Sequence, residues 1–274
     1  LSLGDSGFGT DLFDPLRFGQ VLRTPGYNHP DWADLAIELL QADADRLAAA
    51  VIEPVVQGAS GMFIAEPGDV GRFGRACQEM GVLLVCDEVA TGFGRTGRIF
   101  ASELCGLRPD VLCLGKGLAG GYLPMSSTVA SGAVAEAFLG EDLGARTLYH
   151  GHSFGGNALA AAVALRHLQL FAEMHVLDNV AARSEQIAKR LAELRGNPYV
   201  ADVRARGLMA GVELAPPEPG LRWGHRVCGA AVERGVLLRP LGDVIVLMPM
   251  LTSTAPEIDR IVDTLQVAIG EVCG

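Results

Sequence analysis

Two short apolar runs in the middle of the chain end in side chains that could do chemistry. Residues 82–86 are followed at once by Asp87 and Glu88, and residues 111–114 are followed, after one glycine, by Lys116. Both runs have the length of strands and are bounded by Gly or Pro, so we expect two strands of an α/β sheet. Ligands bind at the carboxyl ends of the strands in such sheets. An acid and a lysine presented there are better placed for chemistry than for solubility.

An amine and an acid at one sheet edge suit the transfer of amino groups. That reaction needs the carbanion formed at the amine's carbon to be delocalised, and pyridoxal phosphate is the usual electron sink. Lys116 could hold this cofactor covalently and, if desolvated between Gly115 and Gly117, could act as nucleophile, general base and general acid. Asp87 could keep the ring nitrogen protonated, because an opposite charge at close range stabilises the charged form. Taken alone, a lysine at a strand end is an ordinary solvated side chain.

The residues around these strands resemble the core of the class III aminotransferases, which are fold type I enzymes that use pyridoxal phosphate. The resemblance covers essentially the whole chain. It rests on five motifs: residues 87–97 (DEVATGFGRTG), Pro109-Asp110, residues 115–121 (GKGLAGG), residues 149–154 (YHGHSF) and Arg239-Pro240. Ala90 and the HGHSF form of the fourth motif are similar to the members of the class that act in biotin synthesis.

The resemblance implies site roles beyond those of Lys116 and Asp87. Further cofactor contacts would come from Val89 on the ring face, and from Gly151, His152 and Ser153 on the phosphate of the neighbouring subunit. Such a shared site implies an obligatory homodimer. For the substrate, Arg239 would bind a carboxylate with its guanidinium fork, Arg95 would bind substrate or fix its loop, and Gly151 would line the site.

Further residues near these motifs have alternative interpretations. Glu53 and Gln57 follow an expected strand and could support Asp87 or be structural. Val246 departs from the tyrosine that some members of the biotin subgroup place in the substrate pocket. His150 and His152 have no acid partner at metal-ligand spacing, so we expect no metal site.

The resemblance implies transfer of an amino group from S-adenosylmethionine to the ketone of an amino-oxononanoate. Another ω-amino acid or amine aminotransferase, with pyruvate or oxoglutarate as acceptor, is the alternative within the class. Residues 92–97 also match the GxGxxG pattern of NAD-binding dehydrogenases, but residues 87–91 separate them from the strand and Gly106 and Pro109 break the segment that follows. An inactive scaffold is the non-enzymatic alternative.

Composition narrows the class of protein. The 274 residues carry a net charge of −10 with a pI near 5.1, which leaves no basic stripe for nucleic acid. The six cysteines form no CxxC pair, so we expect reduced core thiols in the cytoplasm rather than zinc ligands or disulfides. No apolar run has the length of a membrane span. The chain begins at Leu1 without Met, and the family has a long preceding region that carries part of the phosphate site, so we expect a fragment.

The expected fold is α/β, with a large domain (residues 1–174) around a mostly parallel sheet that is incomplete at its N-terminal side. A smaller α+β domain (residues 175–274) would follow. We expect a loop at residues 1–32 and a first helix with Leu35, Leu39, Leu40 and Leu47 on its apolar face. The expected helices are residues 31–50, 67–80, 131–139 with Ser131 as cap, 156–173, 179–195, 222–234 and 256–272. The expected strands are residues 49–56, 82–86, 111–114, 125–130, 200–203, 208–214, 236–239 and 244–247.

Overall fold

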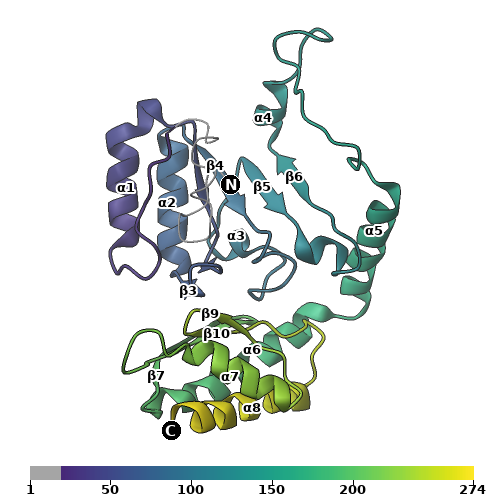
Figure 1. Cartoon of the computed structure of the whole chain (residues 1–274). Helices are drawn as coiled ribbons and strands as arrows, with labels where there is room; N and C mark the ends of the chain where they lie inside the picture. Colours follow the sequence, from purple (N-terminus) through teal and green to yellow (C-terminus); the bar gives the residue numbers. More distant parts are fainter. Residues whose placement is uncertain (1–19) are drawn as a thin grey trace.

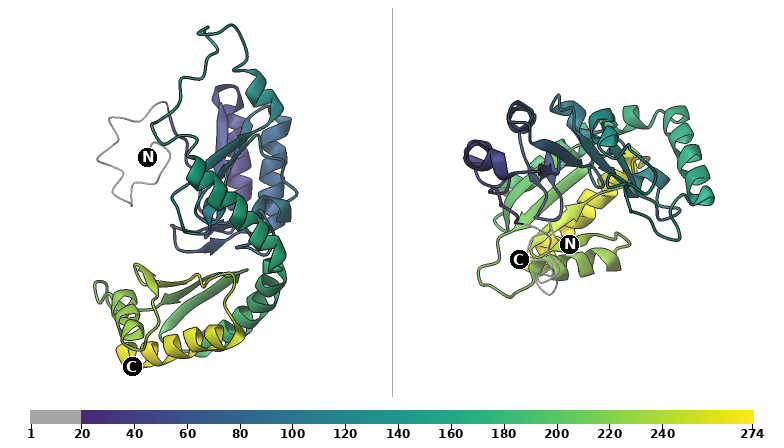
Figure 2. Two further views of the ribbon diagram at one scale, coloured as in Figure 1. Left: turned by 90° about the vertical axis from the view of Figure 1, so that its right-hand side faces the viewer. Right: turned by 90° about the horizontal axis from the view of Figure 1, so that it is seen from above.

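The computed structural model describes residues 20–274 and contains two four-stranded sheets, one above the other in the view of Figure 1. The first sheet has the order β1 (Ala49–Ile52), β4 (Leu83–Asp87), β5 (Val111–Leu114) and β6 (Ser127–Ala130). Its first three strands are parallel and β6 is antiparallel to β5, so the predicted mostly parallel sheet is confirmed. In Figure 2, α5 (Ala158–Glu173) runs along the side of the molecule toward the second sheet.

One face of the first sheet is covered by α1 (Trp32–Asp43) and α2 (Pro67–Glu79). Trp32 and Phe73 of these helices are buried in one cluster with Leu84 of β4. The opposite face carries the alternate residues, of which Val51 is 44% exposed and Leu83 40% exposed. Parallel sheets are usually covered on both faces. The described part of the chain therefore leaves open the face of the sheet on which Asp87 lies.

The first helix is shorter than the sequence predicted, and the face that it buries differs from the predicted apolar face. It ends at Asp43, and a short 3-10 turn, Ala44–Arg46, leads into β1. The buried positions are Trp32, Ala33, Ala36 and Leu40, whereas Leu35 is exposed. The prediction that Leu35 belongs to the apolar face was wrong. Contacts between the Trp32 ring and the rings of Tyr27 and Phe73 set the face that packs inward.

The second sheet is antiparallel throughout and has the order β7 (Val200–Arg206), β8 (Met209–Leu214), β10 (Val244–Leu247) and β9 (Arg239–Leu241). The helices α6 (Val176–Ala192), α7 (Trp223–Glu233) and α8 (Ala255–Cys273) pack with it in one core cluster. The predicted strand at residues 236–239 lies further along the chain, because pairing with β10 begins at Arg239.

Several short elements complete the described part. The sequence analysis missed the hairpin of β2 (Val56–Gln57) and β3 (Phe63–Ile64), and also α3 (Ala101–Leu104) and the 3-10 turns Lys116–Ala119 and Glu193–Gly196. The predicted cap Ser131 accepts a hydrogen bond from the Val134 amide at the start of α4 (Gly132–Glu136). Residues 20–31 form no helix or strand, as predicted, and the rest of the predicted loop at residues 1–32 lies outside the described residues.

No helix among residues 20–274 is both long enough and apolar enough to cross a membrane.

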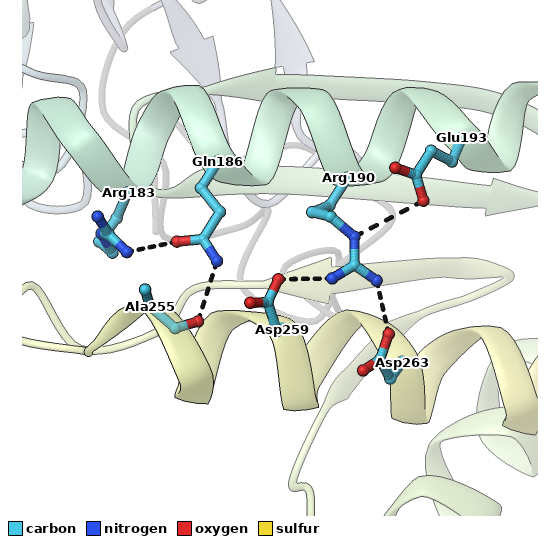
Figure 3. A network of polar contacts seen from close by, with 7 residues as sticks. All are labelled: Arg183, Gln186, Arg190, Glu193, Ala255, Asp259 and Asp263. Carbon is cyan, nitrogen blue, oxygen red and sulfur yellow. Dashed lines mark hydrogen bonds and ion pairs between the residues drawn. The ribbon is translucent and has the colours of Figure 1, made fainter.

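A polar network joins α6 to α8 within the C-terminal part (Figure 3). The Arg190 guanidinium binds Asp259 and Asp263 of α8, and Gln186 donates to the Ala255 carbonyl at 2.9 Å. Hydrogen bonds from Gln186 and Arg190 lower the pKa of the Asp259 carboxyl. The carboxylates of Asp259 and Asp263 are exposed, and solvent screens such pairs.

We expect the Arg190→Met variant to fold normally and to lose only about 2 °C in Tm, because exposed ion pairs contribute little. Thermal unfolding followed by circular dichroism measures this. A loss several times larger would mean that the network is a main determinant of how α6 and α8 pack.

Candidate active site

Asp87 and Lys116 lie at the carboxyl ends of two neighbouring parallel strands. Asp87 is the last residue of β4 and pairs with Cys113 of β5, three residues before Lys116. The Glu88 amide continues this pairing by donating to the Cys113 carbonyl at 2.9 Å. Glu53, the residue after β1, lies on the other side of Asp87 from β5, because β4 is between β1 and β5 in the sheet. The acid and the amine therefore lie at one edge of the sheet, as predicted.

The backbone around Lys116 is shaped for close approach. A Cβ on Gly115 would lie 3.3 Å from Cγ1 of Val89, and a Cβ on Gly117 would lie 3.0 Å from Cβ of Phe93. Lys116 itself has φ +40°, in the left-handed region that non-glycine residues seldom adopt. Such strain persists only where the surroundings impose it and is often found at active sites. The glycines admit Val89 and Phe93 beside the Lys116 backbone.

Lys116 is exposed. The predicted desolvation between Gly115 and Gly117 is not provided by the described residues, because the face of the sheet that carries Asp87 is open.

Glu88, which the sequence analysis gave no role, is fully buried. Its Oε2 accepts from the Ala101 amide and the Thr91 hydroxyl, each at 2.8 Å, and its Oε1 accepts from the Ser102 amide at 2.7 Å. These partners are the start of α3 and the loop that follows Asp87. Glu88 therefore fixes the backbone on the C-terminal side of Asp87.

Glu53, directly after β1, and Gln57, in β2, line one cavity with Asp87. Glu53 accepts from the Gly58 amide at 3.2 Å, and Gln57 accepts from the Tyr27 amide at 2.9 Å. Burial raises the pKa of the Glu53 carboxyl and the Asp87 charge adds to this, while the Gly58 amide and the Lys116 charge lower it. Glu53 is thus a half-buried second acid on the same side of the sheet edge as Asp87.

The side chain of Arg95 contacts main-chain carbonyls of the C-terminal part. It donates to the Pro249 carbonyl and, at 3.5 Å, to that of Leu208, whose amide donates back to the Arg95 carbonyl at 2.9 Å. Burial lowers the pKa of the Arg95 guanidinium to about 10, which still leaves it charged at neutral pH. These contacts fix the loop, which is one of the two predicted roles. A substrate role for Arg95 stays a prediction.

The remaining predicted site residues are exposed. Arg239 begins β9 at the end of the second sheet, where it pairs with Val246 of β10. Gly151, His152 and Ser153 lie in the loop before α5, and the His152 ring accepts from the Phe154 amide at 3.2 Å. No described contact joins these four residues to Asp87 or Lys116, so their roles stay predictions. Residues 20–274 contain no group of three or more His, Cys, Asp or Glu side chains that could hold a metal ion.

The sequence matches a known family over most of its length. The family model of the class III aminotransferases matches residues 26–269. The chain belongs to the class III aminotransferases. Members of this class depend on pyridoxal phosphate. The residues present fit that cofactor: an acid and a lysine follow neighbouring strands, and Gly115 leaves the backbone beside Val89 without a side chain.

Among relatives of this aminotransferase, the adenosylmethionine-8-amino-7-oxononanoate aminotransferase of Nitratidesulfovibrio vulgaris is 42% identical, over 98% of this chain and 52% of its own length. The crystal structure of the enzyme of that name from Methanocaldococcus jannaschii superposes with a TM-score of 0.91 at 37% identity, over 97% of this chain and 63% of that one. An (S)-enantioselective omega-transaminase from Thermomicrobium roseum gives 0.83 at 31% identity, over 89% and 55%. The chain therefore spans about half to two thirds of the length of these proteins.

Proposed function

We propose that this class III aminotransferase transfers an amino group to 8-amino-7-oxononanoate, which forms 7,8-diaminononanoate in biotin synthesis, with S-adenosylmethionine as the donor. The observation that carries the proposal is the placement of Asp87 and Lys116 at the ends of adjacent parallel strands in a chain 42% identical to an enzyme named for that reaction. The name includes adenosylmethionine, which supports the choice of donor. The family resemblance also implies a second possible amino donor, lysine, in place of S-adenosylmethionine.

Each residue of the site would have a separate task. When bound, pyridoxal phosphate supplies the electron sink that stabilises negative charge at the amine's carbon. The ε-amine of Lys116 would hold the cofactor through its aldehyde carbon and, once displaced, would move a proton at the substrate carbon. Asp87 would hold a proton at the ring nitrogen. Val89 would pack on the ring, next to Gly115.

The substrate carboxylate would be bound by Arg239. A guanidinium presents two parallel donors to a carboxylate, which fixes the orientation of the ligand as well as its charge. Arg239 is exposed at the start of β9, so its side chain is accessible to a ligand. Arg95 is held by carbonyls of the C-terminal part and would act on the substrate only indirectly.

We also propose that two copies of the chain share their sites. Large apolar side chains are exposed in the segment of residues 122–159, which ends in the first turn of α5: Tyr122, Leu143, Leu148, Tyr149, Phe154 and Leu159. Exposed apolar surface of this kind is typical of protein interfaces. The same segment contains Gly151, His152 and Ser153, which would then reach the cofactor phosphate of the partner subunit. We further propose that the chain is divided into two domains, residues 1–174 and 175–274. We also propose that it is located in the cytoplasm.

Incubation of the chain with pyridoxal phosphate, S-adenosylmethionine and 8-amino-7-oxononanoate is expected to form 7,8-diaminononanoate, detected by mass spectrometry. In the Asp87→Asn variant we expect the rate to fall by at least about 10²-fold, because the neutral amide no longer stabilises the protonated ring. A donor panel with lysine, β-alanine and 4-aminobutyrate is the control. Turnover of β-alanine or 4-aminobutyrate with pyruvate or oxoglutarate, with no diaminononanoate formed, would contradict the proposal and favour the ω-aminotransferase alternative.

A further inference from the structure

The hairpin of residues 53–65 has an unusual backbone next to the site. The Val56 amide donates to the Pro54 carbonyl at 2.8 Å across Val55, which has φ +69°, the hydrogen-bond pattern of a γ-turn. Met62, the last residue of the loop that joins β2 to β3, has φ +58°. A β-branched residue such as Val55 seldom adopts a positive φ, and its side chain is fully buried. Contacts from outside the hairpin must therefore hold it in place.

Arg204 of β7, in the second sheet, supplies such contacts. Its Nε and Nη2 both donate to the Gly61 carbonyl, at 3.0 and 2.7 Å, and its guanidinium lies 4.4 Å from the ring centroid of Phe63. Its Nη1 donates to the carboxylates of Asp202 and Glu213, at 2.6 and 2.7 Å. Two acids of the second sheet thus orient a largely buried guanidinium whose fork grips the tip of the hairpin.

Apolar contacts join the same two parts. Met62 is buried in one cluster with Met209 and Val246 of the second sheet. Gly211 of β8 allows this approach, because a Cβ there would lie only 3.0 Å from Cβ of Met62. The hairpin is therefore packed against the second sheet as well as bonded to it.

The tip and the base of the hairpin are linked through Gly58. The amides of Gly61 and Met62 donate to the Gly58 carbonyl at 3.3 and 3.1 Å, and the Gly58 amide donates to Glu53 at 3.2 Å. Glu53 is half-buried and follows Ile52, which pairs with Cys86, so its carboxyl lines the same cavity as Asp87. A short chain of hydrogen bonds therefore runs from Arg204 to a side chain beside the two proposed catalytic groups.

We propose that Arg204 is a positioning residue: from the second sheet it fixes the hairpin of residues 53–65, and through Gly58 it holds the Glu53 carboxyl beside Asp87 and Lys116. Lysine cannot replace it, because an ammonium lacks the planar fork that binds Gly61 and lies over Phe63. The claim that this arrangement affects catalysis rests on the proposed function. The claim that Arg204 fixes the hairpin does not.

Hydrogen–deuterium exchange measured by mass spectrometry tests the link without any cofactor. In Arg204→Met and Arg204→Lys we expect exchange at the amides of Gly58, Gly61 and Met62 to rise by about 10-fold or more, because the hairpin loses its outside contacts. The matched control is Arg190→Met, in which another arginine with carboxylate partners, here Glu193, Asp259 and Asp263, is removed from the α6–α8 contact (Figure 3). Unchanged hairpin exchange in folded Arg204→Met, or an equal rise in Arg190→Met, would overturn the proposal.

The ionisation of Glu53 tests whether the link reaches the site. The groups that face this carboxyl are Tyr27, Asp87 and Lys116, and burial raises its pKa. Loosening the hairpin lets water in, so the Glu53 titration, followed by ¹³C NMR and assigned with Glu53→Gln, is expected to move down toward its ordinary range in Arg204→Met and not in Arg190→Met. A Glu53 titration that does not move would refute the positioning role. Failure of the wild-type chain to bind pyridoxal phosphate would count against the proposed function alone.

Discussion

Replacement of Lys116 by alanine is expected to abolish covalent capture of pyridoxal phosphate by this chain. Only an uncharged primary amine can attack the cofactor's aldehyde, and the 274 residues contain just two lysines, Lys116 and Lys189. After incubation with pyridoxal phosphate and reduction with borohydride, peptide mapping should find the label on Lys116 in the wild type and on no lysine of the variant. Any amino-transfer rate should fall by at least about 10³-fold, because the proton carrier is lost as well.

Two controls make this result specific. Lys189→Ala removes an exposed lysine in the last turn of α6 and should leave the label on Lys116 intact. Lys116→Arg keeps the positive charge but cannot act as a nucleophile, since a guanidinium stays protonated. It should lose the label as completely as the alanine variant. Equal labelling of Lys116 and Lys189 in the wild type would mean that Lys116 is an ordinary surface amine.

The strand ends that carry Asp87 and Lys116 could be predicted because the signal is local. Each follows a short apolar run bounded by Gly or Pro, and the carboxyl ends of parallel strands meet at one edge. The exposure of Lys116 could not be predicted in this way. Solvation depends on what covers the sheet face, and that face is open in the described part of the chain.

The hairpin of residues 53–65 was missed for the opposite reason. Its conformation runs against local preference at Val55, where a β-branched residue takes a positive φ, so propensity indicates an ordinary strand through residue 56. The contacts that impose the conformation come from Arg204, which is 143 residues from its acceptor Gly61. Arg95 is similar, since its carbonyl partner Pro249 is 154 residues away. No single-sequence pattern reports such partners.

Glu88 was within reach of a sequence argument. Side chains alternate along a strand, so if Leu83, Val85 and Asp87 face one side of β4, the next residue continues the buried side of Leu84 and Cys86. An acid at a buried position must find hydrogen-bond donors in the protein. The period-two pattern therefore places Asp87 on the open face of the sheet and Glu88 on the buried face, where its role is structural.

Substituting Glu88 by glutamine is expected to be the most destabilising conservative change near the site. Both carboxylate oxygens accept main-chain N–H groups, from Ala101 and Ser102, so a glutamine must turn its own NH₂ toward one of these donors. Leaving a buried donor unpaired should lower the free energy of unfolding by about 3 kcal/mol and Tm by about 6–12 °C. Glu103→Gln, the same chemical change at an exposed position of α3, is the matched control and should cost little. Equal thermal shifts in the two variants would show that the buried carboxylate does not hold the loop after Asp87.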